Sequence, residues 1–132
     1  MPEFYSYQGL RNGGTFLLDD ATAQKIKDNP NQICGKVVTL VDNYTAGYGS
    51  AGDVPLGFVE MVEHEVNFSE QLVVSVVWNR SLEMVPCAGS EKAGNYAQCD
   101  GNGGISASTA ATPARVWGVD AEGKVATVYI HG

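Results

Sequence analysis

The stretch RVWGVDAEGKVATVYIHG, residues 115–132, decides the fold class of this chain. Two runs rich in β-branched and aromatic residues, 115–120 and 124–132, flank the polar segment Asp-Ala-Glu-Gly. A segment with Asp at its start and Gly at its end favours a tight reversal between antiparallel strands. The stretch therefore predicts a β-hairpin at the end of the chain.

The sequence upstream of this hairpin, from Gly35 onward, repeats the same rhythm of short apolar runs and glycine-rich turns. The run 57–66 alternates, so that Phe58, Glu60 and Val62 are expected on one face of a strand. The run 72–78 is apolar on both faces, which indicates a central strand that a closed barrel or an oligomer would cover. The other expected strands are 36–41, 82–86 and short strands near Tyr96 and Ile105. Roughly six to eight short strands predict a mainly β fold, a small barrel or sandwich.

The N-terminal segment is expected to differ from the rest. Residues 1–18 are aromatic and polar, have no sustained period and predict an extended N-terminal arm. Residues 19–29 predict one short helix, because Asp19 suits its N-terminus and Pro30 would stop it. The expected organisation is an arm, 1–18, followed by a single β-rich domain, 19–132.

The composition sets limits on partners and location. With 132 residues and 44% hydrophobic residues, the chain is long enough to bury one core without staples. The net charge of −7 disfavours binding to nucleic acid, because phosphates repel an acidic surface. No apolar run approaches the roughly 18 residues of a membrane span, and no basic segment followed by an apolar stretch marks a secretory signal. Neither a membrane association nor secretion is expected.

Three cysteines, Cys34, Cys87 and Cys99, are expected to be reduced, because an odd number without a signal peptide is typical of a reducing compartment. Cys34 and Cys87 are expected to be buried at strand ends. A disulfide between Cys87 and Cys99 remains the alternative.

The stretch 85–105, VPCAGSEKAGNYAQCDGNGGI, holds two cysteines and five glycines and is a candidate for a metal, redox or phosphate site. Eleven residues separate Cys87 from Cys99, whereas zinc sites place paired cysteines two to four residues apart. A phosphate loop would lead into a helix, and residues 105–113 open none. The stretch is interpreted as turns between short strands.

No other segment carries a catalytic pattern, and no catalytic, cofactor-binding or metal-binding residue is predicted. Glu60 and His64 share the expected strand face, where such a pair is usually solvated. Tyr44, Tyr48 and Tyr96 lie in expected loops or short strands and are the alternative candidates for a sugar-binding surface.

The segments GKVVTLV, GDVPLGFVEMVE, VVSVVWN, VPCAGSEKAGNYAQCDGNGGI and RVWGVDAEGKVATVYIH occur in this order from Gly35 to the C-terminus. In their turns and strand exits they resemble the small structural proteins of tailed-phage and prophage heads, including capsid decoration proteins. The resemblance implies a β-rich protein of the virion surface, often trimeric, made in the bacterial cytoplasm and bound to the major capsid protein. It implies no cofactor and no catalytic residues.

The aromatic residues of the expected arm are the candidate partner-binding residues: Phe4, Tyr5 and Tyr7. An extended arm can add a strand to the open sheet edge of a partner, with aromatic rings filling pockets. The expected function is a non-enzymatic capsid decoration or head-stabilising subunit. A surface-displayed carbohydrate- or ligand-binding β-module is the alternative.

Overall fold

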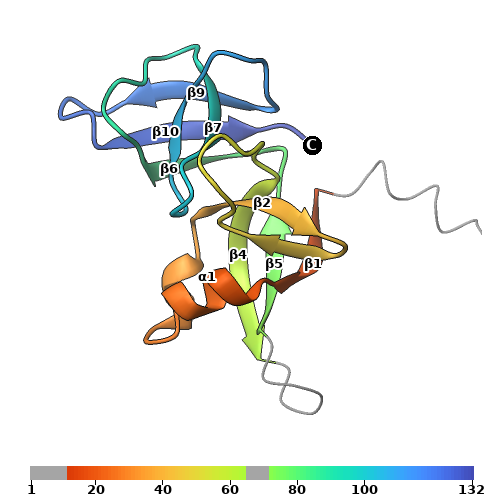
Figure 1. Ribbon diagram of the computed structural model, residues 1–132. Helices are drawn as coiled ribbons and strands as arrows, with labels where there is room; N and C mark the ends of the chain where they lie inside the picture. The colour runs from red at the N-terminus through yellow and green to blue at the C-terminus, as the bar shows by residue number, and fades with distance from the viewer. Residues whose placement is uncertain (1–11, 65–71) are drawn as a thin grey trace, which may run out of the picture.

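The computed structural model of this protein describes residues 12–64 and 72–132 and confirms a mainly β fold. Two five-stranded sheets, one of them closed into a barrel, make up the molecule (Figure 1). The strands are β1 (Gly13–Leu18), β2 (Val37–Asp42), β3 (Thr45–Gly47), β4 (Gly57–His64), β5 (Leu72–Val77), β6 (Arg80–Pro86), β7 (Tyr96–Cys99), β8 (Ile105–Ser108), β9 (Ala114–Val119) and β10 (Val125–Ile130). The helical elements are α1 (Asp20–Lys25) and the 3-10 helix η2 (Pro30–Ile33).

The barrel has the strand order β1-β3-β2-β4-β5 and closes through the pairing of β5 with β1. β5 also pairs antiparallel with β4, so both of its edges are hydrogen-bonded. This is the central strand that the apolar run 72–78 predicts. Its inward-facing Val74 and Val76 pack with Leu18 and Val59 in the barrel core.

Residues 13–18 form the first strand of this barrel, so the prediction that the arm extends to residue 18 is wrong for them. β1 pairs with β5 from Gly13 opposite Val77 to Leu17 opposite Val73, and Leu18 is buried. The glycines suggest an arm in the sequence, but they are needed for close packing: a Cβ on Gly13 would lie 2.7 Å from the carbonyl oxygen of Val76. The candidate residues Phe4, Tyr5 and Tyr7 lie outside the described residues.

The predicted helix is present but ends early. Asp19 is its N-cap, as predicted, and its Oδ1 accepts a hydrogen bond from the backbone N–H of Thr22 at 3.2 Å. The helix ends at Lys25: the C-cap Ile26 leaves the helical backbone with a φ of −113° and is buried in the barrel core. Pro30 does not stop this helix but starts η2, where its fixed φ suits the first position. Within the described part of the chain, no helix is long and apolar enough to cross a membrane.

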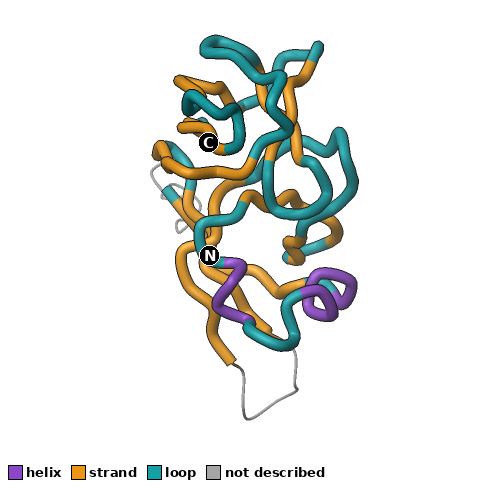
Figure 2. Tube along the Cα trace, turned by 90° about the vertical axis from the view of Figure 1, so that its left-hand side faces the viewer, coloured by secondary structure: helices purple, strands orange, loops and turns teal. Residues whose placement is uncertain are grey.

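The second sheet has the order β6-β10-β9-β7-β8 and contains the predicted C-terminal hairpin, β9 and β10. Asp120 fixes the hairpin turn, because its Oδ1 accepts hydrogen bonds from the backbone N–H groups of Lys124, at 2.8 Å, and Val125, at 3.1 Å. Gly123 completes the turn with a φ of +72°. The two sheets lie one beyond the other along the molecule, with the helical turns at the barrel end (Figure 2).

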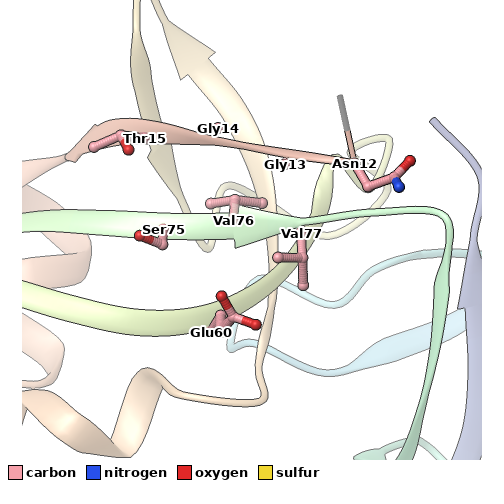
Figure 3. Close-up of a pocket in the computed structure, with 8 residues that line it drawn as sticks. All are labelled: Asn12, Gly13, Gly14, Thr15, Glu60, Ser75, Val76 and Val77. Carbon is pink, nitrogen blue, oxygen red and sulfur yellow. The ribbon is translucent and has the colours of Figure 1, made fainter. Parts of the chain in front are cut away.

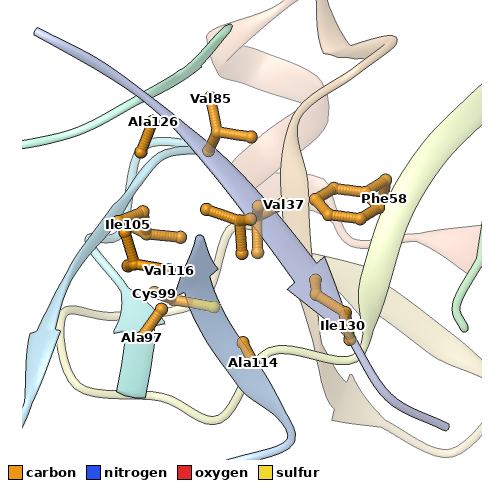
Figure 4. Packing of buried hydrophobic residues seen from close by; sticks show 11 residues of the cluster. Val37, Phe58, Val85, Ala97, Cys99, Ile105, Ala114, Val116, Ala126 and Ile130 are labelled. Carbon is orange, nitrogen blue, oxygen red and sulfur yellow. The ribbon is translucent and has the colours of Figure 1, made fainter. Parts of the chain in front are cut away.

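A second hydrophobic core joins the barrel to this sheet. Val37 and Phe58 from the barrel meet Ile105, Val116 and Ile130 from the second sheet (Figure 4). Because this core covers the outer side of the barrel at Phe58, the two sheets stabilise each other through shared apolar burial.

A bulge in β4 lets one strand serve both cores. Phe58 and Val59 are neighbours and point to opposite faces, toward the shared core and the barrel core respectively. The pairing of β4 with β5 then shifts between Val59 and Met61, which leaves Glu60 as the extra residue and places Val62 against the barrel core. The prediction that Phe58 and Val62 share a face is therefore wrong, because strict alternation takes no account of a bulge.

Candidate functional site

The outer face of the second sheet presents aromatic side chains to the solvent. On β9, the buried Ala114 and Val116 alternate with the exposed Arg115 and Trp117. On β10, Tyr129 stands between two buried residues and is partly exposed on the outer face. Because side chains alternate along a strand, the apolar inner face and the aromatic outer face come from the same short stretches.

Four of these side chains form one stacked pair of rings and one cation–π pair, and we call them the aromatic face: Tyr96, Arg115, Trp117 and Tyr129. The rings of Trp117 and Tyr129 are nearly parallel, with an interplanar angle of 6° and centroids 5.3 Å apart. The guanidinium carbon of Arg115 lies 4.5 Å from the ring centroid of Tyr96. The pairing register explains the contacts, since Arg115 lies opposite Tyr129 on one side and Tyr96 on the other.

A surface pocket of about 420 Å³ lies beside the aromatic face, lined by Gly94, Arg115, Val116 and Trp117. The Gly94 N–H donates a hydrogen bond to the Val116 carbonyl oxygen at 2.7 Å, which holds the 87–95 loop along β9. Gly94 has a φ of +92° and no side chain, and a Cβ there would meet no other atom within 4 Å. The pocket therefore stays open between the loop and the indole ring.

Four of the five strands of this sheet differ in charge from the whole chain, whereas the fifth, β6, carries Arg80 and Glu83. The strands β7, β8, β9 and β10 contain no Asp or Glu, and their single charged residue is Arg115. The chain as a whole has fifteen acidic against eight basic residues. The four strands that carry or border the aromatic face therefore contribute one positive charge, that of Arg115, and no negative charge.

The chemistry of such a surface is that of binding. Trp, Tyr and Arg are the residue types that contribute most to the affinity of protein interfaces. Trp117 is 57% exposed although it is among the largest apolar side chains of the chain. Its ring is already held by Tyr129, so a partner would order few additional side chains on binding.

The tyrosines predicted as a sugar-binding surface do not lie together. Tyr44 is exposed in the turn between β2 and β3, whereas Tyr48 is buried in the barrel core. Burial raises the pKa of the Tyr48 hydroxyl, and the charge of Asp100 raises it further. Of the three, Tyr96 alone belongs to the aromatic face.

Glu60, one of the two residues expected on a shared face of β4, makes an ion pair with an arginine. The Glu60 carboxylate meets the guanidinium of Arg80 at 3.2 Å, and both side chains are half-exposed. Glu60 also lines an open surface pocket of about 410 Å³ whose roof is the backbone of Gly13 and Gly14 (Figure 3). The side chain of His64 lies outside the described part of the structure.

The stretch 85–105 forms turns between short strands, as predicted. Asp100 Oδ1 accepts hydrogen bonds from the N–H groups of Asn102, at 2.7 Å, and Gly104, at 3.0 Å, and so closes the turn between β7 and β8. Gly101 and Gly103 adopt φ values of +90° and +91°. In residues 12–64 and 72–132, no group of three or more His, Cys, Asp and Glu side chains could hold a metal ion.

The three cysteines are free thiols with different environments. Cys34 is exposed, so the prediction that it is buried at a strand end is wrong: it follows η2, where the chain turns outward before β2. Cys87 is half-buried, and its thiol donates to the Gly123 carbonyl oxygen at 3.3 Å. Burial raises the pKa of Cys99 to about 12, and the charges of Asp53 and Asp100 add to the effect.

Glu91 is a buried acid that no sequence pattern indicates. It is 4% exposed; its Oε1 accepts from the Gly89 N–H at 2.7 Å, while Oε2 has no partner among the described residues. Burial raises the pKa of this carboxyl group, but the backbone N–H groups of Gly89, Glu91 and Ala88 lower it by more, so the pKa is below its usual value. Its ionised form therefore stabilises the loop that borders the pocket.

The aromatic face itself was not predicted as a site, although its signal is present in the sequence. Strict alternation in RVWGV and VATVYI places Arg115 and Trp117 on one face of β9 and Tyr129 on the matching face of β10. What alternation cannot give is the register that brings Tyr96 and Arg115 together. The sequence matches no protein-family model and no curated protein.

Proposed function

We propose that this protein is a non-enzymatic structural subunit that attaches to the protein shell of a tailed-phage or prophage head and stabilises it. The observation that supports this most is the aromatic face, where an exposed Trp117 is held in a stacked pair with Tyr129. A large exposed aromatic side chain on a rigid sheet is typical of a protein-docking surface. The resemblance of residues 35–132 to phage head proteins supplies the identity of the partner, a major capsid protein.

The fold suits a subunit that must keep its surface rigid. Sites on strands are held more precisely than sites on loops, because backbone pairing and the buried core fix each side chain. Here the residues beneath the aromatic face, Val116 and Val128, are fully buried in the core that both sheets share. A docking surface built on this core binds without first having to order itself.

The proposal includes the N-terminal residues Phe4, Tyr5 and Tyr7 as a second contact with a neighbouring subunit. Strand addition needs a partner strand with a free edge. The barrel is closed, but in the second sheet β6 and β8 are the outermost strands and each has one sheet neighbour in the described residues, although Ile105 at the start of β8 also forms a β-bridge with Cys87. The homotrimer that we propose rests on the family resemblance, and these two strands are the edges that an arm from a neighbouring copy would reach.

The charge of the chain is consistent with a location on the virion surface. A net charge of −7 keeps the free subunits apart in the bacterial cytoplasm, where the resemblance places their synthesis. The same charge opposes adsorption to nucleic acid, so the proposed partner is the shell and not the packaged genome.

A carbohydrate-binding module is the second candidate, and one observation favours it. Beside the aromatic rings the outer face carries polar side chains, including Gln98, whose Nε2 donates to Ser106 Oγ at 3.2 Å. An aromatic platform bordered by amide and hydroxyl groups can hold the apolar face of a sugar ring while bonding to its hydroxyl groups. This function would use the same surface. The two candidate functions are distinguished by whether Trp117→Ala weakens binding to phage shells or binding to a glycan.

The test is a binding assay with purified phage shells. Empty heads that lack the protein are mixed with the wild-type chain or with Trp117→Ala, sedimented, and assayed for bound chain. Saturable binding of the wild type, with binding by the variant weakened at least about tenfold, supports the proposal. If the wild type stays in the supernatant at all shell concentrations while it binds a glycan array through Trp117, the carbohydrate function replaces it.

A further inference from the structure

We propose that the pocket beside Arg115 and Trp117 recognises a carboxylate on the partner protein, an Asp or Glu side chain that lies next to an apolar residue. This inference rests on the proposed function, because it states the chemistry of the partner at the same surface. It goes beyond that function because it assigns separate tasks to two side chains of the aromatic face.

Arg115 is arranged to bind a carboxylate in the plane of its guanidinium group. With its guanidinium carbon 4.5 Å from the ring centroid of Tyr96, it uses the ring as a support. This cation–π contact occupies one side of the guanidinium group, and N–H donors that make no ion pair with the described residues can form a bidentate pair with a carboxylate. A lysine at this position would offer the charge without the fork.

No side chain of the described residues neutralises Arg115. Two other basic residues of the described chain are paired with acids: Arg80 with Glu60 at 3.2 Å, and Lys124 with Glu122 at 3.7 Å. Arg115 makes no ion pair within residues 12–64 and 72–132. The strands β7, β8, β9 and β10 contain no Asp or Glu. A carboxylate that approaches this surface therefore meets a cation without a competing acid on the same strands.

Trp117 supplies the apolar half of the site. It lines the pocket of about 420 Å³ together with Arg115, Val116 and Gly94. Because the indole is 57% exposed and Gly94 has no side chain, an apolar side chain can pack on the ring while its neighbour reaches Arg115. This pairing of a charge with an apolar neighbour distinguishes the site from a general attraction for anions.

The charge pattern favours a protein carboxylate over other anions. Nucleic acid would have to approach a chain with a net charge of −7, and a single arginine cannot offset that repulsion over several phosphates. One carboxylate needs only one fork, and the apolar neighbour adds the affinity that a lone surface ion pair lacks. The site is thus matched to a short Asp- or Glu-containing segment of a protein.

The experiment uses two peptides, acetyl-Ser-Phe-Glu-Ser-amide and acetyl-Ser-Phe-Gln-Ser-amide. They differ only in that one carries a side-chain carboxylate where the other carries a neutral amide. Each is titrated into the full ¹⁵N-labelled chain at low salt, and the indole N–H signal of Trp117 and the Nε–H signal of Arg115 are followed. We expect the Glu peptide to bind at least about fivefold more tightly than the Gln peptide. The preference should disappear in Arg115→Gln, persist in weakened form in Arg115→Lys, and shrink at high salt.

Several outcomes would overturn the inference. These are equal binding of the two peptides, a preference that survives in Arg115→Gln, absence of any shift of the Trp117 and Arg115 signals, or tighter binding of a glucuronate oligosaccharide than of the Glu peptide. Thermal unfolding of each variant verifies that it is folded.

The shell-binding assay separates this inference from the proposed function. If Trp117→Ala loses shell binding while Arg115→Gln keeps it, carboxylate recognition by Arg115 is refuted and the proposed role as a shell-binding subunit stands. If both variants bind shells as the wild type does, both the carboxylate recognition and the binding role of the aromatic face are refuted.

Discussion

Trp117 and Tyr129 lie ring against ring on the outer face of the second sheet, with centroids 5.3 Å apart and planes 6° from parallel. They come from the two strands of the C-terminal hairpin, and Val116 beside Trp117, like Val128 and Ile130 beside Tyr129, is buried in the shared core. The hairpin therefore has two tasks: its inner side stabilises the fold, and its outer side offers a preformed aromatic surface. Substitutions on the outer side and in the core separate these two tasks.

Replacing Trp117 by alanine is expected to affect binding more than stability. The stacked contact with Tyr129 contributes about 0.5–1.5 kcal/mol, so the thermal midpoint should fall by only a few degrees. Affinity for phage shells should fall at least about tenfold. The matched control is Leu40→Ala on β2, which removes a comparably exposed apolar side chain from the barrel. A similar loss of shell binding in both variants would contradict a role for the aromatic face.

Glu91→Ala is expected to destabilise the chain in a pH-dependent way. Removing the acceptor leaves the Gly89 N–H without its partner and should cost about 1–3 kcal/mol near neutral pH. Because the folded-state pKa of Glu91 is lowered, its ionised form stabilises the fold above the unfolded pKa of about 4.3, and this contribution is lost as the pH falls through the folded value. Urea unfolding at neutral and acidic pH measures it, with the exposed Glu83→Ala as control. A pH-independent cost in Glu91→Ala would refute the assignment.

Alkaline pH is expected to weaken the fold through Cys99. Its folded-state pKa is raised to about 12, whereas an unfolded cysteine titrates near 8.5. Above about pH 8.5 the unfolded chain loses a proton that the folded chain keeps, so stability should fall by at most about 1.4 kcal/mol per pH unit for this group. Chemical unfolding between about pH 7.5 and 9.5, in the presence of a reductant, should give a smaller slope for Cys99→Ala than for the wild type. Cys87, whose pKa is also raised by burial, accounts for part of the remaining slope. Equal slopes would show that Cys99 does not titrate as proposed.

The same substitution, glycine to alanine, is expected to destabilise the fold at one strand position and to leave its stability unchanged or slightly raised at another. A Cβ on Gly57 of β4 would overlap the carbonyl oxygen of Val77 and lie 2.8 Å from Val76 Cγ1, so Gly57→Ala should cost about 1–3 kcal/mol through overpacking. A Cβ on Gly118 of β9 would meet no atom within 4 Å, so Gly118→Ala should be neutral or slightly stabilising. Denaturant unfolding compares them, and similar effects at both sites would contradict the packing described here.

Two truncations test where the folded domain begins. Removal of residues 1–11 leaves every described strand intact, so the unfolding midpoint should change little. Removal of residues 1–18 deletes β1, exposes the paired edge of β5 and takes Leu18 from the core, so the barrel should fail to form. Circular dichroism and thermal unfolding distinguish the two, and a folded chain without residues 1–18 would contradict the closed barrel.

The strands could be predicted from the sequence wherever a local pattern decides the structure. The hairpin follows from two β-branched runs and the turn that starts at Asp120, and the central position of β5 follows from a run that is apolar on both faces. The helix N-terminus follows from Asp19, whose carboxylate caps it. These features depend on residues close in sequence, which is why they can be read without the fold.

The features that escaped prediction depend on partners far away in the chain. Gly13 and Gly14 suggest a flexible arm until the neighbouring β5 is known, and the bulge at Glu60 cannot be seen in an alternating run. The aromatic face needs the register that sets Arg115 beside both Tyr96 and Tyr129. Glu91 in a polar loop gives no sign that its carboxylate will be buried.

The most direct measurement of the central claim is the content of purified virions. Particles from a strain that carries this gene are separated on a density gradient, and mass spectrometry measures the ratio of this chain to the major shell protein, for the wild type and for Trp117→Ala. We predict a constant ratio across the particle peak for the wild type and loss of the variant chain to the soluble fractions. A wild-type chain that stays in the soluble fractions while particles of normal density form without it would contradict the account.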